Sequence, residues 1–360
     1  MTEKLHLSIV GCGAIADSIT QLARWTPGVQ LTAACDISRE RAEAFAHKHK
    51  IPAVYTNYSE MLSAGGFDTT PGGAATENYP AAEYFPAVYL AVPHNLHFEM
   101  IKAAADAGYH IFAEKPITRT FAEGQEIVAY AAEKGVKIGV NYQNRYDSGC
   151  YRLATAVQTG ALGRVLYARI NVPWHREQRY FENSPWHKTL AQAGGGTLIT
   201  QASHFIDIVL WAVGSPPVAA TGYTTKKVFT DVEVEDFAAA TIELENDIIV
   251  QVTSSMVASS EQPVSIEIYG EKGTVIYSNS PRPRVKFIMK RNRVFAKNSV
   301  STAKPPHWGF HALHRSLKGF RDWVLKDEAY LIPGEEALPA LAIVEAIYQS
   351  AQTGQRVTVA

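Results

Sequence analysis

The sequence has few cysteines, almost no net charge and no long apolar runs. Its 360 residues include three cysteines, Cys12, Cys35 and Cys150, too few and too scattered for a disulfide framework or a zinc knuckle. A formal net charge of −1 gives no basic surface for nucleic acid or anionic lipid. No apolar run reaches the roughly 20 residues of a membrane helix, and no signal peptide precedes the first strand-like run. These absences predict a cytoplasmic protein with reduced thiols.

The chain is long enough for two domains, because single cores stop growing near roughly 250 to 300 residues. Residues 1–142 alternate short β-prone runs with helical stretches, which predicts parallel strands joined by helical crossovers. Residues 143–306 contain runs that alternate with period two, which predicts an antiparallel sheet with one face covered by helices. We expect residues 307–360 to form helices and an edge strand that complete the second domain and pack back toward the first.

A glycine-rich turn follows the first apolar run. The motif GCGAIA at residues 11–16 separates a β-prone run from a helical pattern, the layout of a dinucleotide-binding turn. Gly11 permits a tight turn, Gly13 lets the backbone approach a pyrophosphate, and free N–H groups at the helix N-terminus hold the phosphates. The pattern alone is weak, since a plain strand-to-helix turn explains it as well.

The acidic residue Asp36 strengthens this interpretation because it ends the next β-prone run, at residues 29–35. A carboxylate at this position accepts hydrogen bonds from both ribose hydroxyls, which favours NAD over NADP. Arg39 and Arg41 lie just beyond it and offer a 2′-phosphate site instead. The first domain is therefore predicted to be a doubly wound α/β sheet of the Rossmann type that binds NAD, with NADP the less favoured cofactor.

One long segment interrupts the alternation of strands and helices. Residues 66–86 are rich in Gly, Pro, Thr and Ala and have no regular period. Loops of this length in a compact domain are usually functional or disordered. Two interpretations stay open: a lip over the cofactor pocket or a subunit contact, and a mobile surface insertion.

The tripeptide Glu114-Lys115-Pro116 closes the fifth strand of the first domain. This position is the carboxyl edge, where open parallel sheets bind ligands. The proline restricts Lys115 to extended geometry. A lone lysine at a strand end is most often a solvated charge, so the tripeptide needs support from elsewhere in the chain.

A second candidate constellation is GGGTLITQASHFID at residues 194–207. Three glycines allow a close approach of the backbone, and the helix that follows places Thr200, His204 and Asp207 on one face. A single helical histidine more often caps or packs than catalyses, so this stretch is also ambiguous by itself.

Together these motifs resemble the family of glucose-fructose oxidoreductase, inositol 2-dehydrogenase and the rhizopine-catabolism proteins. The resemblance covers nearly the whole chain, including AVPHNLH at 91–97, NYQNR at 141–145, PWH at 185–187 and SAQTGQ at 350–355. It implies an α+β second domain whose large open antiparallel sheet forms a homodimer or homotetramer, and a Lys115–Pro116 bond that is often cis. The cofactor contacts implied by the family are Gly11, Cys12, Gly13, Ala14, Ile15, Asp36, Val92, Asn95, His97, Glu114, Lys115, Asn141 and Trp186.

The chemistry implied by this resemblance is hydride transfer between the nicotinamide and a secondary hydroxyl of a sugar, a sugar derivative or a cyclitol. A base must take the hydroxyl proton, and His204 has a suitable intrinsic pKa. Lys115, partly buried beside a cationic nicotinamide, has a lowered pKa and completes the acid–base pair. No metal is expected, because His307, His311 and His314 share a helical face without an acidic or cysteine partner. The implied substrate contacts are Lys115, Arg145, Trp174, His175, His187, Thr200, Gln201 and His204.

The chain departs from the family at one position. Many members carry an aspartate four residues before the histidine, whereas this chain has Thr200, which orients a hydroxyl group but takes no proton at neutral pH. The resemblance therefore does not predict that this chain shares the substrate of the inositol dehydrogenases that carry this aspartate. The aromatic loop around Trp174 and Trp186 either stacks on a sugar ring or packs beneath the sheet. Two alternative functions stay open: an enzyme that uses tightly bound NAD for glycoside cleavage or epimerisation, and a non-catalytic sensor that binds dinucleotide.

Overall fold

A computed structural model of the protein describes residues 3–65, 84–279, 284–289, 303–309 and 311–359. Most of the segment 66–86 thus lies outside the described residues, and its last three residues begin a strand. The chain forms two compact units. The first unit contains Met1–Thr118, Ala122–Asn141 and His307–Glu336, and the second contains Arg119–Phe121, Tyr142–Pro306 and Ala337–Ala360.

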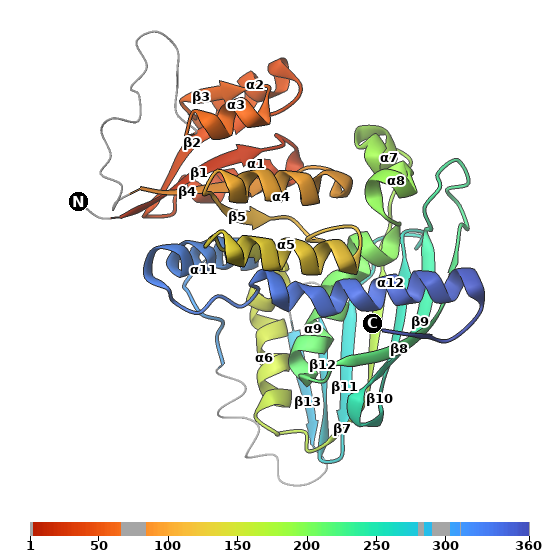
Figure 1. Cartoon of the computed structure of the whole chain (residues 1–360). Coiled ribbons are helices and arrows are strands. Elements are labelled where there is room, and N and C mark those ends of the chain that lie inside the picture. Colours follow the sequence, from red (N-terminus) through yellow and green to blue (C-terminus); the bar gives the residue numbers. More distant parts are fainter. Residues whose placement is uncertain (1–2, 66–83, 280–283, 290–302, 310, 360) are drawn as a thin grey trace. The chain divides into compact units, whose positions relative to one another are not determined.

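The first unit is built on a six-stranded sheet with the strand order β3-β2-β1-β4-β5-β6 (Figure 1). Each pairing within this sheet is parallel. The order reverses between β1 and β4, and ligands bind outside the carboxyl ends of the strands at such a switch point. The doubly wound sheet predicted from the sequence is confirmed. Its strands are β1 (Lys4–Val10), β2 (Val29–Cys35), β3 (Ala53–Tyr55), β4 (Tyr84–Leu90), β5 (His110–Ala113) and β6 (Ile138–Val140).

Among the described residues of the first part of the chain, five α-helices accompany these strands. The central strand β1 is buried from Leu5 to Val10, as expected for a parallel strand covered on both faces. Ser38 and Asn57 cap two of the helices through side-chain hydrogen bonds to backbone N–H groups. The helices are α1 (Ala14–Ala23), α2 (Arg39–His49), α3 (Tyr58–Ser63), α4 (His97–Asp106) and α5 (Phe121–Glu133).

Helix α11 (Ala312–Lys326) also belongs to the first unit, although it lies far along the chain. Its Phe320 ring stacks on Phe112 of β5 with the centroids 5.0 Å apart. His314 Nε2 lies 3.1 Å from Thr26 Oγ1, just beyond the C-terminus of α1. The structure differs here from the expectation that residues 307–360 complete the second domain, because the apolar face of α11 is buried against β5 and α1. The remaining elements of that segment, α12 (Leu338–Thr353) and β14 (Val357–Thr358), lie in the second unit.

The second unit contains an eight-stranded sheet with the order β13-β12-β11-β7-β10-β9-β8-β14. Its pairings are antiparallel except for the parallel pair β7 and β10. A long helical connection carries the chain from β7 to β8, and the meander from β8 to β10 then returns with its third strand running along β7. The mostly antiparallel sheet is thus confirmed, with one parallel pair added. Its strands are β7 (Val165–Pro173), β8 (Pro217–Thr225), β9 (Phe237–Leu244), β10 (Ile248–Ser255), β11 (Ser265–Gly270), β12 (Gly273–Ser278), β13 (Arg284–Met289) and β14.

Helices cover one face of this sheet (Figure 1). On β7 the side chains of Ala168, Ile170 and Val172 are buried, whereas those between them point outward. This alternation is the period-two pattern that the sequence displays. The helices of the second unit are α6 (Ser148–Gln158), α7 (Arg179–Asn183), α8 (Leu190–Ala193), α9 (Ser203–Val213) and α12.

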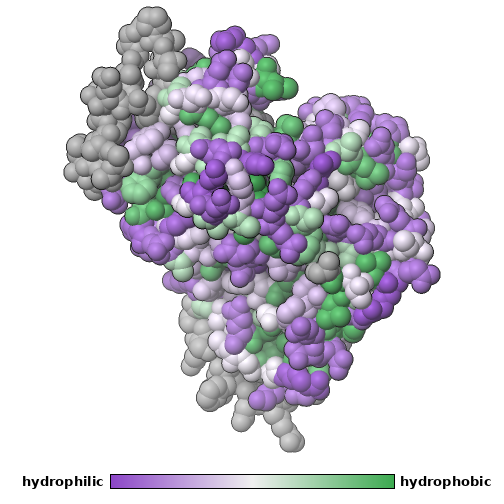
Figure 2. All heavy atoms as spheres, in the orientation of Figure 1, coloured by the Kyte–Doolittle hydropathy of each residue, from purple (hydrophilic) through white to green (hydrophobic). Residues whose placement is uncertain are grey.

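One helical stretch, Leu190–Val213, is long and apolar enough to cross a membrane. However, 83% of its most apolar window is buried inside the structure, as in a core helix of a soluble protein. On the face drawn in Figure 2, hydrophilic side chains are spread among the hydrophobic ones. The stretch is therefore weak evidence for a membrane span.

Candidate functional site

The turn between β1 and α1 uses its two glycines for different purposes. Gly11 has a φ of +84°, and a Cβ atom there would lie 2.3 Å from the carbonyl oxygen of Ala91. Its N–H group donates to the Cys35 carbonyl oxygen over 2.8 Å. A Cβ on Gly13 would meet no atom within 4 Å, so folding alone does not require glycine there. Gly11 closes the turn, and Gly13 leaves open space at the start of α1.

The first turn of α1 is suited to an anion. Its N-cap is Gly13, and no side chain caps the helix. Gly13, Ala14 and Ile15 are exposed at this end. Uncapped N–H groups beside open space form the cradle into which a pyrophosphate fits. Among the expected cofactor contacts, these residues and Gly11 thus have the geometry that the role requires.

Cys12 is buried within the same turn. Burial raises the pKa of its thiol to about 12, and the nearby carboxylate of Asp36 adds to this shift. A thiol that is not ionised at neutral pH is a poor nucleophile. Cys12 therefore contributes its backbone rather than a reactive sulfur.

The carboxylate of Asp36 lies beside this turn. Its Oδ2 accepts the N–H of Cys12 over 3.0 Å, and its Oδ1 accepts the N–H of Ser38 over 2.9 Å. Arg41 Nη2 donates to the same Oδ1 over 2.9 Å. Burial acts to raise the pKa of Asp36, but these hydrogen bonds outweigh it and hold the pKa below its usual value. Asp36 is thus an ionised acceptor at the carboxyl end of β2.

The loop after β4 carries three more of the expected cofactor contacts. Val92 is half-buried, and its carbonyl oxygen lies 3.1 Å from Nε2 of His97. His97 itself is completely buried, so it holds the loop rather than facing the surface. Asn95 has a buried Oδ1 without a hydrogen-bond partner in the described part of the chain. Such an oxygen is an acceptor available to a ligand.

A buried hydrogen-bond network fixes Glu114 at the end of β5. Both the hydroxyl of Tyr89 and the side-chain amide of Asn141 donate to its Oε1, over 2.5 and 2.7 Å. Ser316 Oγ of α11 donates to Asn141 Oδ1 over 3.1 Å and lies 3.2 Å from the hydroxyl of Tyr330. The network holds the Asn141 amide in the orientation that serves Glu114. Sequence reasoning identified Glu114 and Asn141 but missed the other three residues, which come from distant parts of the chain.

Lys115 follows on the carboxyl edge of the sheet. The Lys115–Pro116 peptide bond is cis. Burial lowers the pKa of the Lys115 ammonium group to about 8, and the Glu114 carboxylate opposes this shift. An amine with such a pKa exchanges protons near neutral pH, as an acid–base group must.

In the second unit, a buried carboxylate organises the glycine-rich turn before His204. Glu235 accepts the N–H of Gly196 over 2.7 Å and the N–H of Leu198 over 2.9 Å. Tyr348 of α12 donates its hydroxyl to the same carboxylate over 3.0 Å. A Cβ on Gly196 would lie 1.8 Å from the backbone oxygen of Glu235, and one on Gly195 would lie 2.1 Å from the Tyr348 hydroxyl. These two glycines are therefore required by internal packing.

Glu235 was not among the residues singled out in the sequence. The only local signal is a pair of acidic residues, Glu235 and Asp236, directly before the strand β9. Both are buried. Asp236 accepts the backbone N–H groups of residues 227–229. Two carboxylates thus shape the turn and the loop of this unit.

The helix that follows begins with a π-helical turn, Leu198–Ala202, before α9. Because a π-turn is wider than an α-turn, the spacing of Thr200, His204 and Asp207 is not that of a plain α-helix. Thr200 Oγ1 donates to the Gly196 carbonyl over 2.6 Å. His204 is 9% exposed, and its ring meets the edge of Tyr142 at 5.6 Å between centroids. Gln201 is buried, and its Nε2 has no partner among the described residues.

Arg145 and Asp207, both buried, bind each other in this unit. Arg145 was expected to contact the substrate, but its Nε and Nη2 donate to the Asp207 carboxylate over 3.0 and 2.7 Å. Its guanidinium also lies over the Trp211 ring, 5.4 Å from the centroid. These contacts give Arg145 a structural task.

The aromatic loop packs partly against the hydrophobic core of the second unit and keeps several of its rings partly exposed. Tyr180 and Trp186 pack partly against a hydrophobic cluster that includes Phe181 and Phe229. The rings of Trp186 and Tyr180 also pack on the His187 ring, with centroid distances of 3.7 and 4.6 Å. All of the expected contacts in this loop, Trp174, His175, Trp186 and His187, remain half-exposed.

In the described part of the chain, His307, Asp322 and Glu328 bring possible metal-ligand atoms within 4.8 Å of one another. The Asp322 carboxylate already accepts both Nε and Nη2 of Arg321, over 3.0 and 2.6 Å. Lys326 lies 3.1 Å from it. Two cations thus already balance this carboxylate.

Each unit matches the model of a known protein family. A family model described as "Oxidoreductase family, NAD-binding Rossmann fold" matches residues 5–142, and one described as "GFO/IDH/MocA C-terminal domain" matches residues 151–276. The chain is 24% identical over 383 residues to D-glucoside 3-dehydrogenase of Escherichia coli, with 99% of this chain and 98% of the relative covered. It is 23% identical over 347 residues to 1,5-anhydro-D-fructose reductase of Ensifer adhaerens, with 96% of each covered.

A similar solved structure is the WlbA dehydrogenase of Bordetella pertussis in complex with NADH and UDP-GlcNAcA. It has a TM-score of 0.82 and 25% sequence identity, with 99% of each chain covered. The uncapped helix start, the open space at Gly13 and the ionised Asp36 fit the NAD that this fold binds. The first unit is an NAD-binding Rossmann domain.

Proposed function

Because the chain belongs to the GFO/IDH/MocA oxidoreductase family, we propose that it transfers a hydride between NAD and a secondary hydroxyl of a sugar, a sugar derivative or a cyclitol. The observation that carries the proposal is Lys115, whose amine has a pKa of about 8 at the carboxyl edge of an NAD-binding sheet. NAD supplies the hydride acceptor when the alcohol is oxidised. The chain must then bind the alcohol, orient it and take its proton.

Lys115 and His204 form the proposed acid–base pair. The Lys115 amine donates a hydrogen bond to the reacting oxygen or relays its proton to His204, and its low pKa makes both protonation states accessible. The His204 imidazole takes the proton in the oxidation and returns it in the reduction. Glu114, with its Oε1 held by Tyr89 and Asn141, keeps its other oxygen for a ribose hydroxyl.

The second unit supplies the proposed sugar contacts. Half-exposed Trp174 and Trp186 offer flat apolar faces of the kind that pack on pyranose rings. The unpartnered Nε2 of Gln201 is a donor for a substrate hydroxyl. Relatives named for D-glucosides and 1,5-anhydro-D-fructose support a pyranose-like substrate.

Incubation with NAD and a panel of pyranoses, glycosides, nucleotide sugars and cyclitols tests this function. Reduced nicotinamide absorbance is expected with at least one class, and Lys115→Met is expected to abolish it while the exposed-lysine control Lys272→Met retains it. No reaction across the panel, or a fully active Lys115→Met, contradicts the proposal. Substrate conversion without net NAD reduction would favour glycoside cleavage or epimerisation with bound NAD. Binding of NADH without any turnover would favour a sensor.

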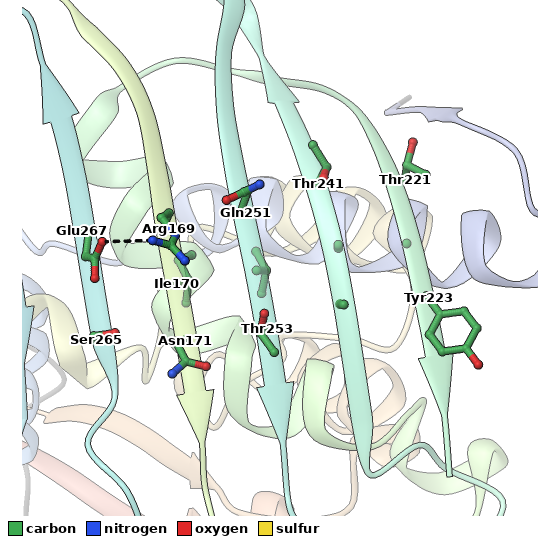
Figure 3. A pocket seen from close by; sticks show the side chains of 14 residues that line it. Arg169, Ile170, Asn171, Thr221, Tyr223, Thr241, Gln251, Thr253, Ser265 and Glu267 are labelled. Atoms are coloured by element: carbon green, nitrogen blue, oxygen red, sulfur yellow. Dashed lines mark ion pairs between the residues drawn. The ribbon is translucent and has the colours of Figure 1, made fainter. Parts of the chain in front are cut away.

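We propose that the exposed face of the eight-stranded sheet joins two copies of the chain. It contains a cleft of about 670 Å³ lined by side chains of β7 to β11 (Figure 3). Arg169 and Glu267 form an ion pair at 3.8 Å between the neighbouring strands β7 and β11, and Tyr167 stacks on Tyr269. Sedimentation is expected to show a dimer or tetramer that Thr253→Arg dissociates. A monomeric wild type would contradict this.

We also propose a cytoplasmic location. The three cysteines are free thiols and are all buried, as suits a reducing compartment. Cell fractionation tests the proposal, and recovery from a membrane or secreted fraction would contradict it.

A further inference from the structure

We infer that Arg176 binds a carboxylate group of the substrate, so that the substrate is a sugar acid rather than a neutral sugar. The inference rests on the proposed function, because it names the substrate class of the same site. Every residue that carries it belongs to the second unit.

The backbone at Arg176 is held by pairing with the segment that follows β10. The N–H of Arg176 donates to the Met256 carbonyl oxygen over 2.8 Å, and the N–H of Trp174 donates to the Ser255 carbonyl oxygen over 3.0 Å. The chain therefore continues beyond β7 in a paired, extended form. This pairing fixes the point from which the Arg176 side chain starts.

The guanidinium of Arg176 lies over two aromatic rings. It is 5.0 Å from the centroid of Trp174 and 5.6 Å from that of Tyr180. Arginine is attracted to the electron-rich faces of such rings, which also orient its plane. The apolar face of a sugar ring packs on aromatic rings as well. The guanidinium therefore lies beside the rings proposed to hold the sugar.

Hydrogen bonds occupy one end of this guanidinium and leave one edge open. Nη1 donates to the His175 carbonyl oxygen over 2.7 Å and to Glu261 Oε2 over 3.4 Å. Among the described residues, Nε and Nη2 of Arg176 have no hydrogen-bond partner, and both atoms are accessible to solvent. The side chain as a whole is only 26% exposed. Nε and Nη2 form the edge that binds a carboxylate through two parallel hydrogen bonds.

Two contacts place these rings beside the helical segment that carries His204. The Trp174 ring meets the edge of Phe205, the residue after His204, at 6.1 Å between centroids. The hydroxyl of Tyr180 hydrogen-bonds with Thr200. One aromatic ring thus separates the guanidinium from α9. A sugar that presents its reacting hydroxyl to His204 consequently lies within reach of the open edge.

The charges around Arg176 favour a carboxylate over a phosphate. Glu261 is exposed, and its Oε2 accepts the His175 N–H over 3.2 Å while it offsets part of the guanidinium charge. The nearby Arg179 is already paired with Glu177 at 2.9 Å. A phosphate monoester carries roughly two negative charges at neutral pH and binds where several donors converge. A carboxylate carries one charge, is planar and matches a single edge of arginine.

Three variants separate the effect of the open edge from that of charge and of packing. Arg176→Met keeps an apolar stem against the rings but removes the charge and the donors. Arg176→Lys keeps the charge without the paired donors. Arg179→Met is the matched control, because it removes an exposed arginine three residues further along the same loop.

The test measures binding to the enzyme–NADH complex, in which no oxidation takes place. Dissociation constants are determined calorimetrically for three matched pairs, glucose and glucuronic acid, galactose and galacturonic acid, and UDP-glucose and UDP-glucuronic acid. Glucose 6-phosphate is added as a phosphate probe. In at least one pair the acid is expected to bind about tenfold or more tightly than its neutral partner, as a charge-assisted hydrogen bond implies. Arg176→Met is expected to lose this preference, Arg176→Lys to keep part of it, and Arg179→Met to keep all of it.

Four results would overturn the inference. These are equal binding of acid and neutral sugar in every pair, equal weakening of both members of a pair in Arg176→Met, loss of the preference in Arg179→Met, and tighter binding of glucose 6-phosphate than of any acid. The equal weakening is what a merely structural role of Arg176 would produce.

Turnover with NAD separates this inference from the proposed function. NAD reduction by neutral sugars alone would overturn the inference and leave the proposed function standing. Binding of an acid that depends on Arg176, without NAD reduction by any sugar, would contradict the proposed function and support the binding site.

Discussion

Arg145 and Asp207 form a two-pronged ion pair inside the second unit, with Nε–Oδ2 and Nη2–Oδ1 distances of 3.0 and 2.7 Å. Both residues are almost fully buried. The pair connects the segment after β6 to α9, the helix that carries His204. It therefore ties the segment after β6 to that helix.

Asp207→Asn is expected to destabilise the protein by about 3–5 kcal/mol, because it leaves the buried Arg145 guanidinium without a counter-charge. The matched control is Glu271→Gln, which breaks the exposed pair between Arg164 and Glu271 and is expected to cost less than about 1 kcal/mol. Urea unfolding measures both changes. Similar losses in the two variants would contradict the structural role of Arg145.

Substitution of the two glycines in the dinucleotide turn is expected to separate folding from binding. Gly11→Ala should lower the free energy of unfolding by more than about 1 kcal/mol, because of its positive φ and the nearby Ala91 oxygen. Gly13→Ala should leave the free energy of unfolding unchanged and weaken NADH binding by about tenfold or more. Unfolding curves and NADH titrations check both. A Gly13→Ala variant with normal NADH affinity would show that the pyrophosphate lies elsewhere.

Lys115 is expected to make stability depend on pH. Its pKa falls from the usual 10.5 to about 8 on folding, so the unfolded chain binds more protons between these values. The free energy of unfolding should therefore increase as the pH rises from about 8 to 10.5, because the cost of burying the charged amine is relieved. Lys115 should add no pH dependence below this window. Lys115→Met should lack this rise, whereas Lys272→Met should follow the wild type. Parallel curves for wild type and Lys115→Met, measured on either side of the window, would contradict the shift.

The glycine turn before His204 is expected to depend on Glu235. Glu235→Gln keeps one acceptor and leaves the N–H of Gly196 or of Leu198 unpaired, at a cost of about 1–3 kcal/mol. Gly196→Ala should cost at least about 3 kcal/mol, since its Cβ overlaps the Glu235 backbone. Unfolding experiments test both, with Gly13→Ala as the control for a glycine that has free space. A stable Gly196→Ala would refute the packing argument.

Local signals in the sequence were sufficient for much of the fold. The β-prone run expected at residues 29–35 agrees with β2, Val29–Cys35, because the apolar residues that signal the strand are neighbours in the sequence. The glycine turn and the Asp36 position at the end of β2 follow from neighbouring residues in the same way, and their cofactor contacts stay predictions. These features depend on residues close together in the chain.

Long-range partners had no such signal. Ser316 meets Asn141 and Tyr330 meets Ser316 only after α11 has packed in the first unit, and no local pattern distinguishes these two residues from other helix or loop residues. The triple glycine predicted a close backbone approach but not its partners, Glu235 and Tyr348. The parallel pairing of β7 with β10 likewise depends on the path of the whole second unit. The Lys115–His204 pair stays a prediction.

The late position of α11 in the chain has a consequence for biosynthesis. Gly139 gives room to Phe320 and Tyr330, and Phe320 stacks on Phe112. During translation the nucleotide-binding sheet leaves the ribosome well before these two aromatic residues are made. The apolar surface that they cover therefore stays exposed to solvent while the second unit is synthesised. A fragment that stops at residue 142 would retain this uncovered face, which predisposes it to aggregate.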